Sequence, residues 1–167
     1  MHGWTFRNRE FRSMYVVGVI LFMVVLPLLS IGNDRFIHHA SAPLMLLAGK
    51  WFVFWAAGIR QSAAGVWQFF QPQFTVEGIF GIRSNDALPF VRELGIANFA
   101  LGVVGILSIV RPDFVLPVAI ASCLFYGIAG VRHATDRQKG VKQNVAMVTD
   151  VFVTVVLVTY IVNAVEH

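Results

Sequence analysis

The sequence predicts an all-α integral membrane protein, built as a helical bundle of five transmembrane helices. Three observations predict this class. Hydrophobic residues make up 57% of the 167-residue chain and charged residues only 13%, with a mean hydropathy of +0.70, whereas soluble domains carry about 25% charged residues. The apolar residues gather in five long stretches, and most of the Lys and Arg residues lie between alternate stretches. At this length we expect residues 1–167 to form a single membrane domain.

Each stretch has the length that a helix needs to cross a hydrocarbon core of about 30 Å. The predicted spans are Met14–Ile31, Leu44–Phe70, Leu88–Val110, Phe114–Ala134 and Val145–Val165. We expect the last four to form a four-helix core, with the N-terminal helix packed outside it. The first span, which follows a basic segment and contains Pro27, also fits a secretory signal peptide. No small-x-small cleavage site directly follows it, so we expect a retained helix.

The distribution of Lys and Arg predicts the topology, because cytoplasmic loops are enriched in both. With five spans and a cytoplasmic N-terminus, the outer side holds Arg35 and Arg111, with Lys50 near that interface. The inner side then holds eight basic residues, namely Arg7, Arg9, Arg12, Arg83, Arg132, Arg137, Lys139 and Lys142. We therefore expect a multi-pass protein of the inner (plasma) membrane of the cell, with the C-terminus outside.

Two connections have their own signals. Arg111-Pro112-Asp113 predicts a tight turn between helices, with Pro112 near the start of the next helix. The segment 71–87 is half apolar and is interrupted by Gly78 and Gly81. Because lipid does not tolerate exposed irregular backbone, we expect this segment to lie along the interface or to dip back into the bundle.

Arg60 lies near the centre of the second predicted span and is followed by Gln61. A cation at that depth costs at least about 2.5–3.5 kcal/mol on insertion scales, so it requires water or an internal partner. Helical spacing places Gln68 on the same face as Arg60. The helix rise of about 1.5 Å per residue places Glu93 and Asp150 in the same, cytoplasmic half of the membrane, and either carboxylate is a candidate partner for Arg60.

These considerations predict one buried polar pocket to which four helices contribute. Its candidate residues are Arg60, Gln61, Gln68, Glu93, Asn98, Tyr126, His133 and Asp150. Three interpretations stay open: polar side chains that only hold the helices together, a ligand or ion site, and proton-coupled or enzymatic chemistry. The first two are favoured over the third.

Several functional classes have little support. The single cysteine, Cys123, excludes an intrachain disulfide and a paired-cysteine metal site. The net charge of +4 is explained by membrane topology rather than by nucleic acid binding. His38-His39 is weak support for a metal site, so none is assigned. No phosphate-binding glycine loop, catalytic triad signature or HExxH motif is present, and no catalytic residue is assigned.

Two compositional features bear on partners. Gly95, Gly102 and Gly105 are typical of close helix packing, and self-association is an open alternative. The second span is rich in Trp and Phe, which we interpret as interfacial anchors and packing residues; a stacking platform for a quinone-like ring is the alternative.

The chain resembles an uncharacterised family of small bacterial multi-span membrane proteins over roughly residues 44–165. The stretches that carry the resemblance are Lys50–Trp55 with Gly58–Gln61, Gln71–Thr75, Arg92–Gly95 with Asn98, Phe125–Gly130, and Asn144–Met147 before Asp150. The four-helix part is loosely similar to DoxX-like proteins, some of which are subunits or partners of membrane redox systems. That similarity implies a quinone or redox role only by analogy, and it carries over no catalytic residue and no known cofactor.

Two functional hypotheses follow. The first is a non-enzymatic membrane protein, assembling with itself or a larger membrane complex. Its pocket would hold a membrane lipid or a quinone-like molecule, with Arg60 as the cation and Glu93 or Asp150 as the counter-charge. The second is a small proton- or ion-coupled transporter or channel in which Glu93 and Asp150 titrate or bind ions.

Overall fold

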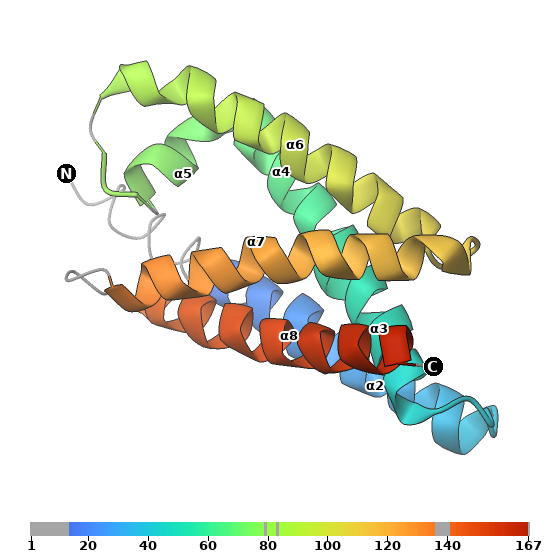
Figure 1. Cartoon of the computed structure of the whole chain (residues 1–167). Coiled ribbons are helices and arrows are strands. Elements are labelled where there is room, and N and C mark those ends of the chain that lie inside the picture. The colour runs from blue at the N-terminus through green and yellow to red at the C-terminus, as the bar shows by residue number, and fades with distance from the viewer. Residues whose placement is uncertain (1–13, 79, 83, 136–140, 167) are drawn as a thin grey trace.

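The computed structural model describes residues 14–78, 80–82, 84–135 and 141–166, and these residues form helices and turns without a strand (Figure 1). Six of the basic residues counted above lie outside the described residues: Arg7, Arg9, Arg12, Arg83, Arg137 and Lys139.

The first long helix runs over Met14–Ile37 and ends later than the predicted span. It contains two π-helical stretches, η1 (Leu21–Val25) and η2 (Asn33–Ile37), on either side of α2 (Leu26–Gly32). Pro27 has no N–H to donate and its ring crowds the carbonyl of the preceding turn. The wider turns of η1 lie directly before this proline, where they accommodate it within an unbroken helix.

The second long helix is continuous over the predicted span but also changes its winding. It consists of α3 (Leu44–Phe52), the π-helical stretch η3 (Val53–Arg60) and α4 (Gln61–Phe70). Single π-turns inside α-helices often occur at functional sites. Here Arg60 is the last residue of η3, at the point where regular α-helix resumes.

The remaining chain is α-helical apart from short connections. After α4 come α5 (Pro72–Gly78), η4 (Asn85–Ala87), α6 (Leu88–Leu107), η5 (Pro112–Phe114), α7 (Val115–Thr135) and α8 (Val141–Glu166). Pro112 begins η5 as the sequence predicts. Within the segment 71–87, α5 folds back onto the bundle, where it buries Thr75 and Val76 and packs beside α4 and α6.

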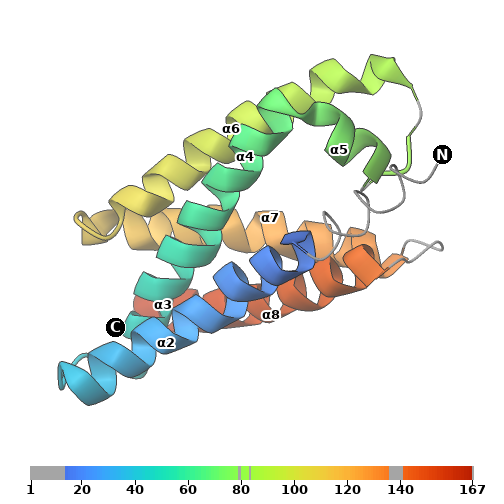
Figure 2. The same ribbon diagram turned by 180° about the vertical axis from the view of Figure 1, so that it is seen from behind.

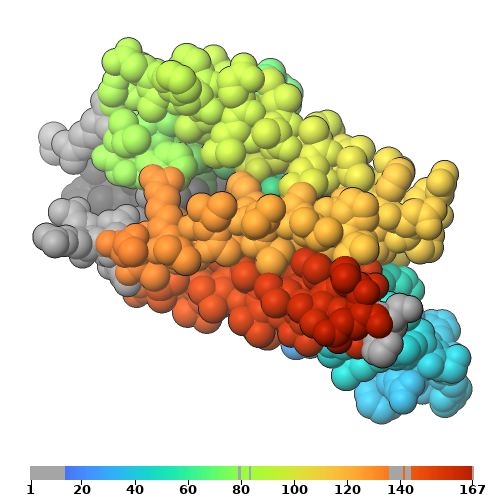
Figure 3. Space-filling view, viewed as in Figure 1, coloured from blue at the N-terminus to red at the C-terminus, as the bar shows by residue number. Residues whose placement is uncertain are grey.

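Within the described residues, four helices are long and apolar enough to cross a membrane: Met14–Ile37, Asn85–Leu107, Pro112–Thr135 and Asn144–Glu166. Their outer faces carry exposed apolar residues, such as Leu124 and Val131 on α7, which lies between α6 and α8 in Figure 3. The structure thus indicates a helical membrane protein. The predicted fifth span, Leu44–Phe70, is not among the four, because its charged and amide side chains lower its hydropathy.

The hydrophobic core differs from the predicted four-helix core with an external first helix. Val19 and Met23 of the first helix are buried in it, together with residues of α3, η3, α7 and α8 such as Phe52 and Leu157. Among the described residues, none of the fully buried members of this cluster comes from α6. The first helix therefore belongs to the core. The helix α6 instead packs against the second helix through its backbone.

Close backbone contact between glycines joins α6 to the second helix. A Cβ added to Gly65 would lie 2.5 Å from the carbonyl oxygen of Gly95, and one added to Gly105 would lie 2.8 Å from Cα of Gly58. A Cβ added to Gly102 would lie 2.5 Å from the backbone nitrogen of Ser62. The glycines that raised the alternative of self-association are used within the chain, where they let two antiparallel helices approach closely.

At one end of the bundle, polar side chains join the first helix to the second. Asp34 accepts hydrogen bonds from Lys50 Nζ at 2.9 Å and from Trp51 Nε1 at 2.8 Å. Trp55 Nε1 donates to Ser30 Oγ at 2.9 Å one turn further in. The pairs α4–α6 and α7–α8 lie close together near the turn between α6 and α7, and they diverge toward the opposite end, where α5 lies (Figures 1 and 2).

Candidate functional site

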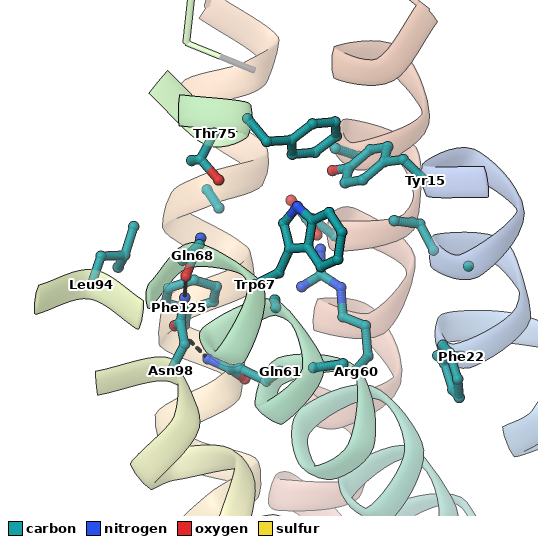
Figure 4. Close-up of a pocket in the computed structure, with 18 of the residues that line it drawn as sticks. Tyr15, Phe22, Arg60, Gln61, Trp67, Gln68, Thr75, Leu94, Asn98 and Phe125 are labelled. Carbon is teal, nitrogen blue, oxygen red and sulfur yellow. Dashed lines mark hydrogen bonds between the residues drawn. The ribbon is translucent and has the colours of Figure 1, made fainter. Parts of the chain in front are cut away.

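The diverging helices line a partly open cavity of about 630 Å³. Its walls come from the first helix, α4, α6, α7 and α8, and α5 with the residues after it contributes Phe74, Thr75 and Phe80. The apolar part of the wall includes Val19, Phe22, Trp67, Leu94, Phe125 and Ile128. Figure 4 shows how labelled aromatic and polar side chains converge on this space.

Arg60 enters the cavity from the end of η3. Its guanidinium lies over the ring of Tyr126, with Cζ 5.6 Å from the ring centroid. The hydroxyl groups of Tyr126 and Tyr15 and the carboxylate of Asp150 are its electrostatic neighbours. Among the described residues, no carboxylate oxygen lies within 4.0 Å of this guanidinium. The cation therefore faces the cavity without a direct ion pair.

Asp150 lies on the wall that α8 contributes. Its side chain is only 5% exposed, and Oδ2 is 4.0 Å from Nε2 of His133 at the end of α7. The other oxygen, Oδ1, is buried and has no hydrogen-bond partner among the described residues. Because a buried polar atom without a partner costs about 1–3 kcal/mol, this oxygen calls for a donor from outside the described side chains.

A chain of hydrogen bonds connects three helices beside the cavity. Tyr126 donates to the backbone carbonyl of Ala56 at 2.7 Å and lies 3.4 Å from Gln61 Oε1. Gln61 Nε2 donates to Asn98 Oδ1 at 3.1 Å, and Asn98 Nδ2 donates to Gln68 Oε1 at 2.8 Å (Figure 4). These hydrogen bonds hold the amide side chains of Gln61, Asn98 and Gln68 in place on this wall of the cavity.

The structure brings most of the predicted site residues together. Six of them line the cavity: Arg60, Gln61, Gln68, Asn98, His133 and Asp150. Tyr126 lies behind the wall and joins it through its hydroxyl group. Glu93 is exposed on α6 and is not among the lining residues. Of the two predicted counter-charges, only Asp150 shares the cavity with Arg60.

Sequence reasoning missed the contribution of the first helix and of the segment after α4. Tyr15, Gly18 and Phe22 line the cavity at helical spacing. In the sequence, this spacing and the single tyrosine of the apolar run, Tyr15, were the features that could have indicated a polar face on the first helix. Arg132, which we interpreted from the sequence mainly as a topology signal with anionic lipid binding as the alternative, also lines the cavity, and its Cζ lies 5.3 Å from the ring centroid of Phe80. Within the described part of the chain, no three metal-ligating side chains gather.

Comparison with known proteins gives a family but no activity. No curated protein and no solved structure matches the chain, so the similarity to DoxX-like proteins stays a prediction. A family model described as a family of unknown function, DUF6790, matches residues 12–167. Because the match covers nearly the whole sequence, this chain belongs to the DUF6790 family.

Proposed function

We propose that this protein is a five-span membrane protein that binds a lipid-like or quinone-like molecule in the cavity beside Arg60. In this proposal it lies in the cytoplasmic membrane with its N-terminus inside. It acts there as a binding protein, alone or as an accessory subunit of a larger membrane complex, rather than as an enzyme.

The helix over 44–70 supports a fifth crossing. At about 1.5 Å per residue, its 27 residues are long enough to cross the hydrocarbon core. The residues that lower its hydropathy are turned inward: Arg60, Gln61 and Gln68 line the cavity, and Lys50 pairs with Asp34. A helix with these contacts turns Arg60 toward the cavity and pairs the partly exposed Lys50 with Asp34 near its end, so its low hydropathy is compatible with a crossing.

The observation that carries the binding proposal is the environment of Arg60. A guanidinium forms strong, often bidentate hydrogen bonds with anionic groups, yet this one has no carboxylate within 4.0 Å among the described residues. It faces a space whose walls are mostly apolar and aromatic. A cavity of this size, apolar with a few convergent polar groups, is typical of sites for small amphipathic molecules.

Native mass spectrometry of the purified protein tests this proposal. We expect the wild type to retain a lipid or a quinone, and Arg60→Gln to lose at least nine-tenths of it. Arg111→Gln is the matched control, because Arg111 lies in the exposed turn between α6 and α7, and it should retain the molecule. A wild type that carries nothing, with Arg60→Gln lowering only the thermal stability, would show that Arg60 merely holds helices together.

A second candidate function rests on Asp150 and His133. They lie 4.0 Å apart in the cavity, and a side-chain movement that brings them to hydrogen-bond distance would allow proton exchange, whereas the exposed Glu93 has no part in such a path. If the protein is instead a proton-coupled transporter, Asp150→Asn should abolish proton flux into liposomes and Glu93→Gln should leave it unchanged.

A further inference from the structure

We infer that the cavity selects a zwitterionic phospholipid headgroup in which a primary ammonium accompanies the phosphate, as in phosphatidylethanolamine. This inference rests on the proposed binding function and names the class of ligand. It follows from two opposite charges, Arg60 and Asp150, that share one cavity without pairing.

The separation of these charges is the first step. In a medium of low polarity an unpaired ion is costly, and two opposite charges in reach of each other are expected to pair. Arg60 and Asp150 line the same cavity but do not approach within 4.0 Å. A guest that carries a phosphate and an ammonium joined by a two-carbon chain would supply a counter-charge to each of the two separated groups, which a singly charged or neutral guest would not.

The second step concerns the buried oxygen of Asp150. A carboxylate accepts hydrogen bonds and donates none when ionised, and Oδ1 has no donor among the described residues. The nearest ring nitrogen of His133 is 4.0 Å from Oδ2, longer than a hydrogen bond of about 2.7–3.2 Å. A primary ammonium offers three N–H donors to the carboxylate of Asp150, whose buried Oδ1 would turn toward the cavity to accept one of them. The quaternary ammonium of phosphatidylcholine offers none, so the two lipids are distinguished at this atom.

The third step concerns the phosphate. The planar guanidinium of Arg60 matches the geometry of two phosphate oxygens, and it is held at the end of η3 over the ring of Tyr126. Arg132, which is exposed at the cytoplasmic end of α7 in the proposed orientation, adds a second cation to the same cavity. The side chains of Trp67, Phe22 and Ile128 provide apolar surface for the beginning of the acyl chains.

A quinol is the competing guest. Its hydroxyl group would donate to Asp150, but it is neutral and would leave both the guanidinium and the carboxylate without a contacting counter-charge. The charge arrangement therefore favours the zwitterion, and the quinol becomes an outcome of the test.

The test compares three phospholipids with the same acyl chains, carrying ethanolamine, choline or glycerol headgroups, added to delipidated protein in detergent. Retention is read by native mass spectrometry, and stabilisation is read from the shift in unfolding temperature. We expect the wild type to retain the ethanolamine lipid about tenfold or more over the choline lipid, the ratio expected for a hydrogen bond to a charged group. Asp150→Asn should reduce this ratio at least fivefold.

Two variants keep the result interpretable. Glu93→Gln removes an exposed carboxylate outside the cavity and should keep the wild-type preference. Asp150→Glu keeps the charge and should keep more of the preference than Asp150→Asn, so a general folding defect is recognised. Equal retention of the ethanolamine and choline lipids, or an unchanged preference in Asp150→Asn, would overturn the inference.

The outcomes also separate this inference from the proposed function. If a quinol or the glycerol lipid is retained and then lost in Arg60→Gln, while ethanolamine is not preferred, the binding function stands and the headgroup assignment is wrong. If no lipid or quinol binds in a manner that depends on Arg60, both are wrong.

Discussion

Tyr126 is the residue that connects the π-helical stretch of the second helix to α7. Its hydroxyl group donates to the carbonyl of Ala56, within η3, and lies beside Gln61, and its ring lies next to the Arg60 guanidinium. A π-turn alters the regular pairing of backbone groups, and this hydroxyl provides one of its carbonyls with a partner. The residue that presents Arg60 to the cavity thus also stabilises the backbone from which Arg60 projects.

Removing this hydroxyl group should have a measurable cost. Tyr126→Phe leaves the buried carbonyl of Ala56 without its donor, so we expect a loss of about 1–2 kcal/mol in the free energy of unfolding. Tyr160→Phe is the matched control, because Tyr160 is also buried but its hydroxyl group makes no hydrogen bond with the described residues; it should change stability by less than about 0.5 kcal/mol. Equal effects in equilibrium unfolding would contradict the role given to Tyr126.

Individual residues show what the sequence predicts well and what it does not. Arg60 and Asp150 are recognisable because a charge inside an apolar run is costly anywhere in the membrane. Counting residues predicts a similar depth for Glu93, but its direction differs: it precedes Asn98 by five residues, which is roughly 140° around a helix, and Asn98 is the one that faces the cavity. The depth of a side chain in the membrane can be predicted by counting residues along the helix, whereas the direction in which it points depends on how that helix packs against its neighbours.

At the scale of elements, α6 packs closely against the second helix because the residues at their contact are glycines, which have no side chains. Gly65 and Gly95 bring the two backbones into contact, and Gly58 and Gly105 repeat this further along. The close approach also lets Asn98 reach both Gln61 and Gln68. The spacing of glycines in the sequence predicts a close contact, but it does not distinguish a partner within the chain from a second copy, because both would use the same face.

This contact gives a prediction with an internal control. Gly65→Ala places a Cβ 2.5 Å from the Gly95 carbonyl and from the Phe99 amide nitrogen, and two backbones cannot yield as a flexible side chain would. We expect a loss of about 1–3 kcal/mol in unfolding free energy. Gly32→Ala, with no atom within 4 Å of the new Cβ, should be neutral or stabilising by up to about 1 kcal/mol. Comparable losses in both variants would show that the close approach is not what matters.

At the scale of the whole molecule, the two ends of the bundle differ in chemistry. One end is closed by Asp34 with Lys50 and Trp51, where oppositely charged groups are already paired. The other end opens into the cavity, where Arg60 and Asp150 remain apart. In the proposed orientation the cavity faces the cytoplasmic half, on the side where the basic residues of the sequence concentrate. Apart from the first helix, which continues to Ile37, the helix ends are close to those that hydropathy predicts. The π-helical stretches are not predictable in this way, because an apolar pattern does not distinguish a π-turn from an α-turn.

The crossing of the helix over 44–70 decides this orientation, and single cysteines on either side of it test the crossing. Ser41 and Asn85 are exposed in the connections that flank this helix, and Cys123 is replaced by Ala in all variants. With five spans, a membrane-impermeant maleimide added to intact cells should label Ser41→Cys at once, and Asn85→Cys only after permeabilisation, because the basic side stays inside. Asp113→Cys, in the exposed turn between α6 and α7, should behave like Ser41→Cys. Labelling of Ser41→Cys and Asn85→Cys from the same side would mean that this helix does not cross, and that Arg60 lies at the membrane surface rather than within it.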